Sequence, residues 1–253
     1  MISTPRLLCT FLLLALAPAS PGRAQAQEPG PGPGTNSPAA SAPATNSAPA
    51  GANPVPAQPD AITAILSDAV HLMTQGQPDA ALEKVNLAIR LAPQDPDSYG
   101  LRASLYAQKQ AWPEAQKDYH KVLEIDPANV PAKFDLAEIK FKLKLYDQAR
   151  SDFAALEKDD ALGDLASYRV FVCDLAAGHV EAAGRELDAF NQIGGNASYY
   201  FANAAWSLYH HKTEEGRGWL TSGVQIYAQE KVNSYCTSLK DLGYLPLPPA
   251  PGE

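Results

Sequence analysis

Cysteine is scarce in this chain of 253 residues, and the sequence motifs of common enzyme sites are missing. Cys9, Cys173 and Cys236 are too few for the disulfide framework of a small secreted fold. Residues 27–253 contain no CxxC pair, glycine-rich phosphate loop, HExxH helix or GxSxG turn. We therefore predict no catalytic residue, no metal site and no cofactor, and we do not expect an enzyme.

Basic charge is also in short supply. The chain carries 20 Lys and Arg against 28 Asp and Glu, a net charge of -8, and loss of an N-terminal leader containing Arg6 and Arg23 would change it to -10. No stretch concentrates Lys and Arg beside aromatic residues. Because an acidic chain repels phosphates, we expect it to bind neither nucleic acid nor an anionic membrane surface.

The one long apolar run lies at the N-terminus. Arg6 precedes the run 7–19, and Ala24-Gln25-Ala26 offers a small-x-small cleavage site. We expect residues 1–26 to be a signal peptide, with the mature protein exported to a periplasmic or extracellular location; a buried core helix is the alternative. Cys9 precedes most of the run, so it does not predict a lipid anchor, and the mature form should have no stable membrane span.

Two further segments have too few apolar residues to form a core. Pro, Gly, Ala, Ser, Asn and Thr dominate residues 27–59, which we expect to be a disordered linker, either a spacer that holds a binding module away from a surface or an inert leader. Residues 244–253 form a Pro-rich tail that cannot continue a helix. The folded domain is therefore expected to span residues 60–243.

A sequence repeat runs through this domain. Pro93 and Pro127 lie 34 residues apart, and we take this spacing as the repeat period. Each proline closes a stretch made of a helix, a short break and a second helix. The first unit has one apolar stripe before its break at residues 76–78 and another after it, formed by Ile65, Ala69, Leu72, Ala81, Val85 and Ala88. A helix-break-helix repeat with this spacing predicts a stack of helical hairpins.

The second unit resembles the tetratricopeptide repeat. That family has an aromatic, a small residue and another aromatic on the first helix, an alanine early on the second helix, and a closing proline. The residues that match are Tyr99, Ala103, Tyr106, Ala115 and Pro127. The first unit has Ile65 and Leu72 in place of the aromatics, and the third has Lys140 and Ala161 in place of an aromatic and of the proline. The third unit otherwise keeps Leu136, Ala137, Tyr146, Ala149 and Phe153.

The helix-break-helix layout continues beyond the third unit with weaker matches. Residues 165–177 and 182–190 form a fourth pair, residues 199–210 and 215–227 a fifth, and residues 232–242 a last helix that would cover the apolar face left open by the fifth pair. The resemblance therefore implies an all-α, right-handed α-solenoid of about five helical hairpins. Three hairpins are similar to tetratricopeptide repeats, two are divergent, and a C-terminal capping helix follows.

The resemblance also implies where a partner would bind. In tetratricopeptide proteins the first helix of each pair lines a concave surface, which commonly holds an extended peptide or a partner helix. The residues of this chain that match that surface make an apolar, aromatic set: Leu66, Val70, Met73, Gly100, Ser104, Ala107, Phe134, Glu138, Phe141, Tyr168, Val172, Phe201, Ala205 and Tyr209. The alternative is that these aromatic side chains only pack between hairpins.

Family members that clamp the C-terminal carboxylate of chaperone tails use Lys, Arg and Asn side chains on these helices. The matching positions here are Leu66, Val70, Leu101, Pro131 and Asp135, which offer no cationic donor. We therefore expect a ligand to dock mainly through apolar side chains.

Two smaller features point to structure rather than chemistry. His210 and His211 could bind a metal only if Glu214 or Glu215 converged on them, but helix neighbours point about 100° apart, so a metal site is not expected. Cys173 and Cys236 should stay reduced, because the fifth hairpin would separate the helices that carry them.

Three hypotheses about function follow. The first is an exported protein–protein interaction module, an adaptor or assembly factor with an unidentified protein or peptide partner. The second is a structural component of an envelope assembly that self-associates. The third is an enzyme or ligand receptor in the divergent half, around Tyr199, Tyr200, Trp206, His210 and His211.

Overall fold

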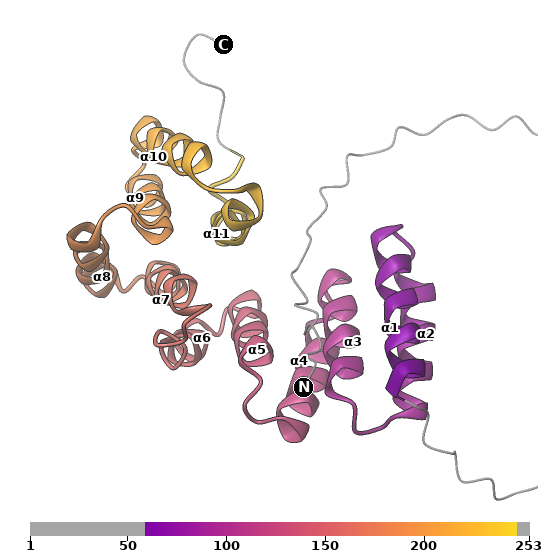
Figure 1. The fold of residues 1–253 in the computed structure, drawn as a ribbon. Coiled ribbons are helices and arrows are strands. Elements are labelled where there is room, and N and C mark those ends of the chain that lie inside the picture. The colour runs from indigo at the N-terminus through magenta and orange to yellow at the C-terminus, as the bar shows by residue number, and fades with distance from the viewer. Residues whose placement is uncertain (1–58, 247–253) are drawn as a thin grey trace, which may run out of the picture.

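The computed structural model describes residues 59–246, and the regular structure within them is entirely helical (Figure 1). The predictions of a signal peptide at residues 1–26 and of a linker up to residue 58 lie outside the described residues, as does most of the predicted tail. Within the described part of the chain, no helix is both long enough and apolar enough to cross a membrane.

The helices form five consecutive hairpins and one final helix, which confirms the predicted all-α solenoid. In chain order they are α1 (Pro59–Thr74), α2 (Pro78–Leu91), α3 (Pro96–Gln108), α4 (Trp112–Ile125), α5 (Val130–Lys142), α6 (Tyr146–Ala154), α7 (Gly163–Ala177), α8 (Val180–Ile193), α9 (Ala197–Tyr209), α10 (Thr213–Ile226) and α11 (Gln229–Asp241).

Short polar side chains fix where the first helices of several hairpins begin. The carboxylate of Asp95 accepts a hydrogen bond from the backbone N–H of Ser98 at 2.9 Å at the start of α3. Asn129 and Asn196 do the same for α5 and α9. Each cap satisfies a backbone donor that has no partner inside its helix. The caps therefore stabilise the beginnings of these helices.

The turn inside each hairpin contains one residue with positive φ. These residues are Gly76, Gln110, Lys144, Gly178 and His211, and the first four follow one another at the same interval as Pro93 and Pro127. Only two of them are glycine, although glycine adopts this left-handed conformation with least strain. The positive-φ residues therefore recur with the sequence period, and each lies in the turn that reverses the chain between two paired helices.

Small residues allow paired helices to approach closely. Ala69 and Ala81 of the first hairpin and Ala103 and Ala115 of the second are fully buried. In the fifth hairpin the corresponding residue is Gly216, where a Cβ atom would lie 2.8 Å from the side chain of Leu208 on α9. Glycine therefore lets α9 and α10 pack more closely than alanine would allow.

The last helix, α11, is present as predicted, and it also reaches the fourth hairpin. We expected a helix that covers the apolar face left open by the fifth pair. The helix packs on α9 of that pair and on α7 of the fourth pair, with somewhat less contact to α10, which directly precedes it (Figure 1). The reason is a set of long-range contacts, described below, that holds α11 on the first helices of the fourth and fifth hairpins. It lies on the inner side of the curved stack.

Candidate functional site: the inner face of the solenoid

The first helices of the hairpins form an inner face with two parts. We call α1, α3 and α5 its open half, because within the described residues α11 packs mainly on α7 and α9 and reaches α5 through the Lys142–Asp241 ion pair. We call α7 and α9 its covered half, because α11 packs on both. The predicted partner-binding residues are divided between these two halves.

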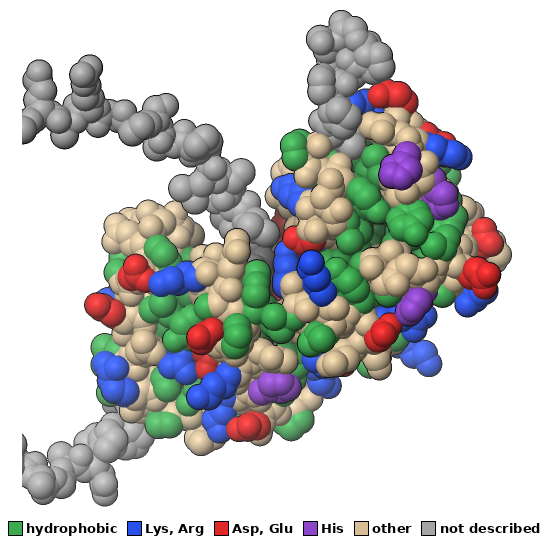
Figure 2. Space-filling view, turned by 180° about the vertical axis from the view of Figure 1, so that it is seen from behind, with side chains coloured by type: hydrophobic (Ala, Val, Ile, Leu, Met, Phe, Trp, Pro, Cys, Tyr) green, Lys and Arg blue, Asp and Glu red, His purple; other side chains and the backbone are tan. Residues whose placement is uncertain are grey.

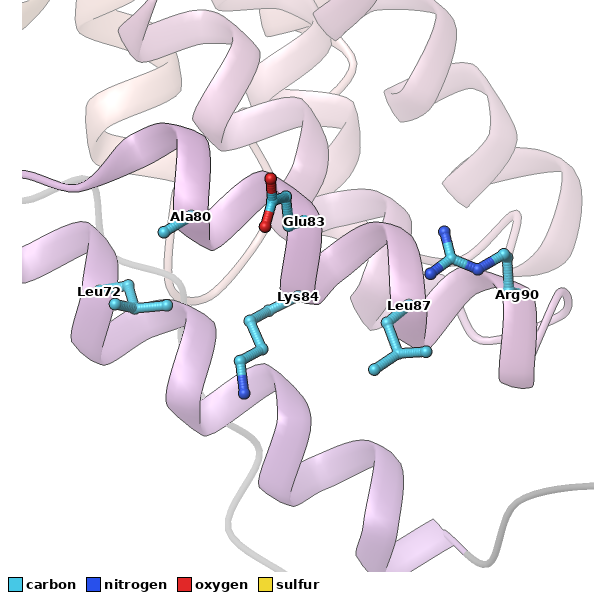
Figure 3. Close-up of a pocket in the computed structure, with 6 residues that line it drawn as sticks. All are labelled: Leu72, Ala80, Glu83, Lys84, Leu87 and Arg90. Carbon is cyan, nitrogen blue, oxygen red and sulfur yellow. The ribbon is translucent and has the colours of Figure 1, made fainter. Parts of the chain in front are cut away.

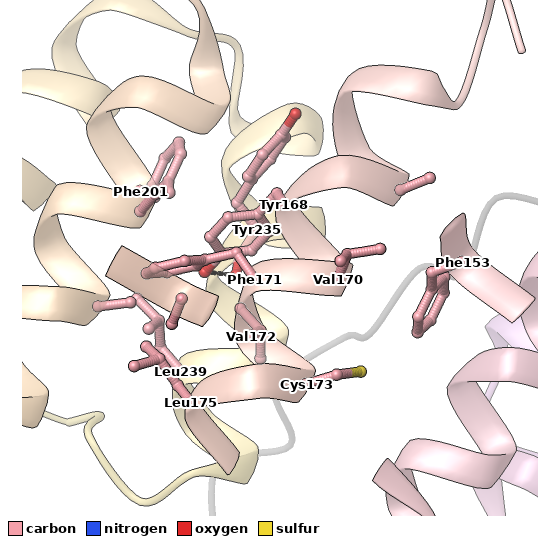
Figure 4. Close-up of a cluster of buried hydrophobic side chains, with 14 of the residues drawn as sticks. Phe153, Tyr168, Val170, Phe171, Val172, Cys173, Leu175, Phe201, Tyr235 and Leu239 are labelled. Atoms are coloured by element: carbon pink, nitrogen blue, oxygen red, sulfur yellow. Dashed lines mark hydrogen bonds between the residues drawn. The ribbon is translucent and has the colours of Figure 1, made fainter. Parts of the chain in front are cut away.

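The covered half contains the most aromatic part of the predicted groove. Tyr168 of α7 and Phe201 of α9 are fully buried, and Tyr235 of α11 packs against both (Figure 4). The ring centroids lie 4.8 Å apart for Tyr168 and Tyr235, and 5.0 Å apart for Phe201 and Tyr235. Val172 is also fully buried. The chain therefore places its own helix where a partner was expected at these residues.

Hydrogen bonds reinforce this contact. The Tyr235 hydroxyl donates to Asp164 Oδ2 at 2.6 Å, and the Tyr168 hydroxyl donates to the Tyr235 carbonyl at 3.2 Å. Ser238 Oγ donates in turn to the Tyr168 hydroxyl at 3.2 Å. Burial raises the pKa of Tyr235, and its hydrogen bond to Asp164 acts in the same direction. Both phenols therefore remain protonated donors at neutral pH.

Ion pairs join α11 to α5 and α7 as well. Arg169 of α7 is 3% exposed and lies 2.8 Å from Glu138 of α5, while its Nη2 donates to the Ser234 carbonyl of α11 at 3.2 Å. Lys142 of α5 pairs with Asp241 of α11 at 2.5 Å. Glu138, predicted to face a partner, is thus engaged within the protein. Burial raises the pKa of Glu138, and the nearby Arg169 opposes that shift.

Phe134 and Phe141 do not line an open groove. The ring of Phe134 packs edge-on against Phe153 of α6 at 5.1 Å, and the ring of Phe141 lies 5.2 Å from Tyr146 of the same helix. Both phenylalanines are buried. For these two residues the structure favours the alternative interpretation, packing between helices.

The open half keeps a smaller apolar surface. Leu66, Val70 and Met73 of α1 are partly exposed, as is Gly100 of α3, whereas Ser104 and Ala107 are each 7% exposed. In the covered half, Ala205 is fully buried and Tyr209 is half-buried. The accessible predicted residues are therefore concentrated on α1.

Asp135 is a polar feature of the open half. Its carboxylate is hydrogen-bonded to the Tyr119 side chain, and burial raises the pKa of Asp135 to about 7. The Tyr119 and Ser104 hydroxyls lie 3.2 Å apart. The sequence singled out Asp135 only as a position where carboxylate-binding family members carry a cationic or amide side chain. It gave no indication of a role for Asp164, Arg169 or Tyr235. Helical periodicity could not reveal these residues, because their roles depend on packing between helices far apart in the chain.

A pocket lies away from the inner face, on the surface of the first hairpin (Figure 3). It is lined by Leu72, Ala80, Glu83, Lys84, Leu87 and Arg90. Lys84 pairs with Asp68 across the hairpin at 3.2 Å. The lining combines opposite charges with two leucines and contains none of the residues predicted to face a partner.

The aromatic residues of the divergent half pack against one another. Tyr199 and Trp219 have ring centroids 5.3 Å apart, and the His210 ring lies 4.4 Å from that of Trp206. His211 is the left-handed residue of its turn. No group of three or more His, Cys, Asp or Glu residues within 59–246 is arranged to hold a metal ion.

Cys173 and Cys236 are free thiols, as predicted, but not because a hairpin lies between their helices. The fifth hairpin does not separate their helices, because α11 packs directly on α7. The Cys173 side chain points away from Tyr235 and Leu239, toward Phe153 (Figure 4). Burial raises the pKa of the Cys236 thiol to about 11.

Comparison with known proteins agrees with this architecture. The family model of the tetratricopeptide repeat matches residues 106–169. Hsp70-Hsp90 organizing protein 2 of Arabidopsis thaliana is 35% identical over 86 residues, which make up 34% of this chain and 15% of that protein. Hsp70-Hsp90 organizing protein 1 of Glycine max is 30% identical over 90 residues, 36% of this chain and 16% of that protein. The chain thus covers only a small part of these relatives' length.

Solved structures share the fold at low sequence identity. PilW, described as a widely conserved type IV pilus biogenesis factor, superposes with a TM-score of 0.55 at 14% identity, covering 74% of this chain and 89% of PilW. A tetratricopeptide repeat protein from Parabacteroides merdae superposes with a TM-score of 0.54 at 18% identity over 71% of each chain. These matches show a shared fold; the family model at residues 106–169, with the helical hairpins and their regular sequence period, identifies the chain as a tetratricopeptide repeat protein.

Proposed function

We propose that the mature chain is an exported protein–protein interaction module, an adaptor or assembly factor, that binds an extended peptide or a partner helix along the open half of its inner face. The observation that carries this proposal is the unequal use of the inner face. The covered half is filled by α11, whereas Leu66, Val70 and Met73 of the open half remain partly exposed. The tetratricopeptide fold generally serves as a scaffold for binding proteins.

The proposed partner docks mainly through apolar side chains. The names of the Hsp70-Hsp90 organizing proteins describe them as organizing Hsp70 and Hsp90. In this chain the positions that would clamp a chaperone carboxylate hold no cation, and one of them holds Asp135. A carboxylate would find no cationic donor there. We therefore propose a partner other than a carboxylate-terminated chaperone tail.

Export is supported by the leader alone. A positive residue, an apolar run and a small-x-small site follow one another over residues 1–26. Fractionation of the native host, with N-terminal sequencing of the purified chain, tests this proposal. A mature N-terminus near residue 27 in the periplasmic or extracellular fraction supports export, and an intact Met1 in the cytoplasm contradicts it.

The open half is tested by a double variant with a matched control. Partners are first identified by affinity purification from the native host, and the affinity of the purified partner is then measured by calorimetry. Val70→Ser with Met73→Ser should weaken binding about tenfold or more, because apolar anchors dominate such interfaces. Leu87→Ser removes an exposed apolar side chain of α2 that is not in the predicted set, and it should leave the affinity unchanged. Equal affinity for a folded double variant contradicts the proposal.

Self-association is the second candidate, and an exposed apolar surface at the far end of the stack favours it. Ile193 at the end of α8 is 71% exposed and Ile226 at the end of α10 is 55% exposed. The Tyr227 hydroxyl donates to the Gly195 carbonyl at 2.6 Å and brings these two helix ends together. Light scattering over a range of concentrations tests it. A mass that rises with concentration and returns to monomer in Ile193→Ser with Ile226→Ser supports self-association, and a constant monomer mass contradicts it.

A further inference from the structure

The α11 helix occupies the covered half in the manner of a bound helix. Its buried residues are Val232, Tyr235, Ser238 and Leu239, at the i, i+3, i+6 and i+7 spacing of a helix that lies in a groove. Most of its contacts are with α7 and α9 and not with the neighbouring α10. The contact therefore resembles the binding of a ligand helix more than the addition of another repeat.

The link between α10 and α11 permits this arrangement. It consists of Tyr227 and Ala228, with backbone angles φ -107°, ψ 148° and φ -60°, ψ 147°. Both residues are extended, so the chain leaves α10 without a tight, hydrogen-bonded reversal. Because α11 is attached to the stack only through this short extended link, its position depends on its contacts with α5, α7 and α9.

Some polar atoms in these contacts lack a full set of hydrogen bonds. Arg169 Nη1 is buried and has no hydrogen-bond partner within the described residues, and the Arg169–Glu138 ion pair is not aligned as a hydrogen bond. A buried charge that keeps an unsatisfied donor costs free energy and offsets part of the attraction of its ion pair. This cost arises where α5, α7 and α11 meet. It lowers the stability of the state in which α11 lies on α7 and α9, relative to a state in which α11 has detached.

We propose that the α7–α9 surface is a second docking site, specific for a helix, and that α11 is its resident occupant, which a partner helix of the same character replaces. This site is centred on the covered half, shares with the open half only the charged residues of α5, and does not depend on a partner binding at α1. The groove supplies aromatic rings from Tyr168 and Phe201 and the carboxylate of Asp164.

The chemistry of the partner helix follows from the contacts that α11 makes. An aromatic side chain with a hydroxyl group fills the place of Tyr235, where it stacks on Phe201 and donates to Asp164. A small hydroxyl residue three positions later takes the place of Ser238, and a leucine follows it directly. An acidic residue near the C-terminal end of the helix pairs with Lys142, as Asp241 does.

The test uses a peptide with the sequence of residues 228–246 as the probe and the full mature chain as the receptor. In the wild type, α11 blocks the site, so labelled peptide should show little binding by fluorescence anisotropy. In Tyr235→Ala with Leu239→Ala, α11 is weakened in its own groove, and the wild-type peptide should bind at least tenfold more tightly than to the wild-type chain. A peptide carrying the same two alanines should not bind.

A matched receptor variant separates displacement from a general surface effect. Glu230→Ala changes an exposed residue of α11 and should leave peptide binding at the wild-type level. If the double variant is folded by circular dichroism and does not bind the wild-type peptide, the proposal is overturned.

Hydrogen exchange on the unmodified chain gives an independent result that does not depend on the double variant folding. The proposal requires that α11 detach while the hairpins stay intact, so its backbone amides should exchange at least about tenfold faster than those of α7 and α9. Equal protection of α11, α7 and α9 would mean that α11 leaves only when the hairpins unfold. That result overturns the proposal whatever the peptide experiment shows.

Discussion

Arg102 and Asp118 form a two-point ion pair between α3 and α4, with Arg102 Nε and Nη2 each 2.7 Å from an oxygen of Asp118. The equivalent positions of the first hairpin, one repeat period earlier, are Asp68 and Lys84, which also pair but with the charges exchanged. The two pairs differ in burial, since the Asp118 side chain is 5% exposed and that of Asp68 is 64% exposed. The repeat therefore keeps a charged link between paired helices without keeping its residues.

Removing the acid of each pair should give very different results. Asp118→Ala leaves Arg102 without its carboxylate in a part-buried site and should lower the free energy of unfolding by about 2–4 kcal/mol. Asp68→Ala breaks an exposed pair and should cost about 0–1 kcal/mol. Chemical denaturation followed by circular dichroism measures both. Equal losses for the two variants would show that burial does not decide the strength of this link.

The left-handed turn residues predict a stabilising substitution. Lys144 has a φ of 61° between α5 and α6, where a side chain is strained. Lys144→Gly should relieve that strain and raise the free energy of unfolding by about 0.5–1 kcal/mol, after allowance for the greater flexibility of glycine in the unfolded chain. Thermal unfolding detects the gain.

The matched control is the reverse change at the equivalent turn of the next hairpin. Gly178 has a φ of 81°, and no atom lies within 4 Å of an added Cβ. Gly178→Ala should therefore destabilise through backbone strain alone, by about 1 kcal/mol. If Lys144→Gly also lowers the melting temperature, strain at these turns is not the controlling factor.

Two glycines in α10 should respond in opposite ways to alanine. At Gly216 an added Cβ would lie 2.8 Å from the Leu208 side chain and 3.3 Å from the Ala204 carbonyl oxygen, so Gly216→Ala should destabilise by about 1–3 kcal/mol. At Gly218 nothing lies within 4 Å, and Gly218→Ala should stabilise by about 0.5–1 kcal/mol through helix propensity. Thermal unfolding of both variants tests the pair, and a stabilising Gly216→Ala would show that α9 can move away from α10 at little cost.

Local features of the sequence were sufficient to predict the hairpins. The spacing of Ala69, Ala81, Ala103 and Ala115 reports contacts between helices that are close in the chain, and all four residues are fully buried as expected. The break at residues 76–78 was visible because it contains glycine. The equivalent turns at Gln110 and Lys144 carry no glycine, so their left-handed backbone could be inferred only from the period.

The inner face could not be predicted in the same way. The hydrogen bond between Tyr235 and Asp164 joins residues 71 positions apart, and no repeat relates the helices that carry them. The period shows which residues of α7 and α9 face inward, but it says nothing of what covers them. The last helix was expected on the fifth pair, but its contact with Tyr168 of the fourth pair could not be inferred from the period.

Stability should fall as the pH rises through the range in which Asp135 loses its proton. Burial raises the pKa of Asp135 to about 7 in the folded protein, whereas an aspartate in an unfolded chain titrates near about 3.9. The folded state therefore holds more protons between these values. The stabilising contribution of the protonated side chain is complete below about pH 4 and is lost as the pH increases to about 7.

Asp135→Asn tests this origin of the pH dependence. Asparagine cannot ionise and keeps an oxygen that can accept a hydrogen bond from Tyr119. The variant should therefore lose less stability than the wild type as the pH rises. Because the Asp135 side chain is partly accessible, we expect a difference of about 1–2 kcal/mol between wild type and variant in their change from pH 5 to pH 8. Denaturation midpoints across that range supply the measurement, with Asp97→Asn as an exposed control on α3. Parallel pH profiles for the wild type and Asp135→Asn would show that another group is responsible, and Glu186, whose pKa burial raises to about 8, is then the next to substitute.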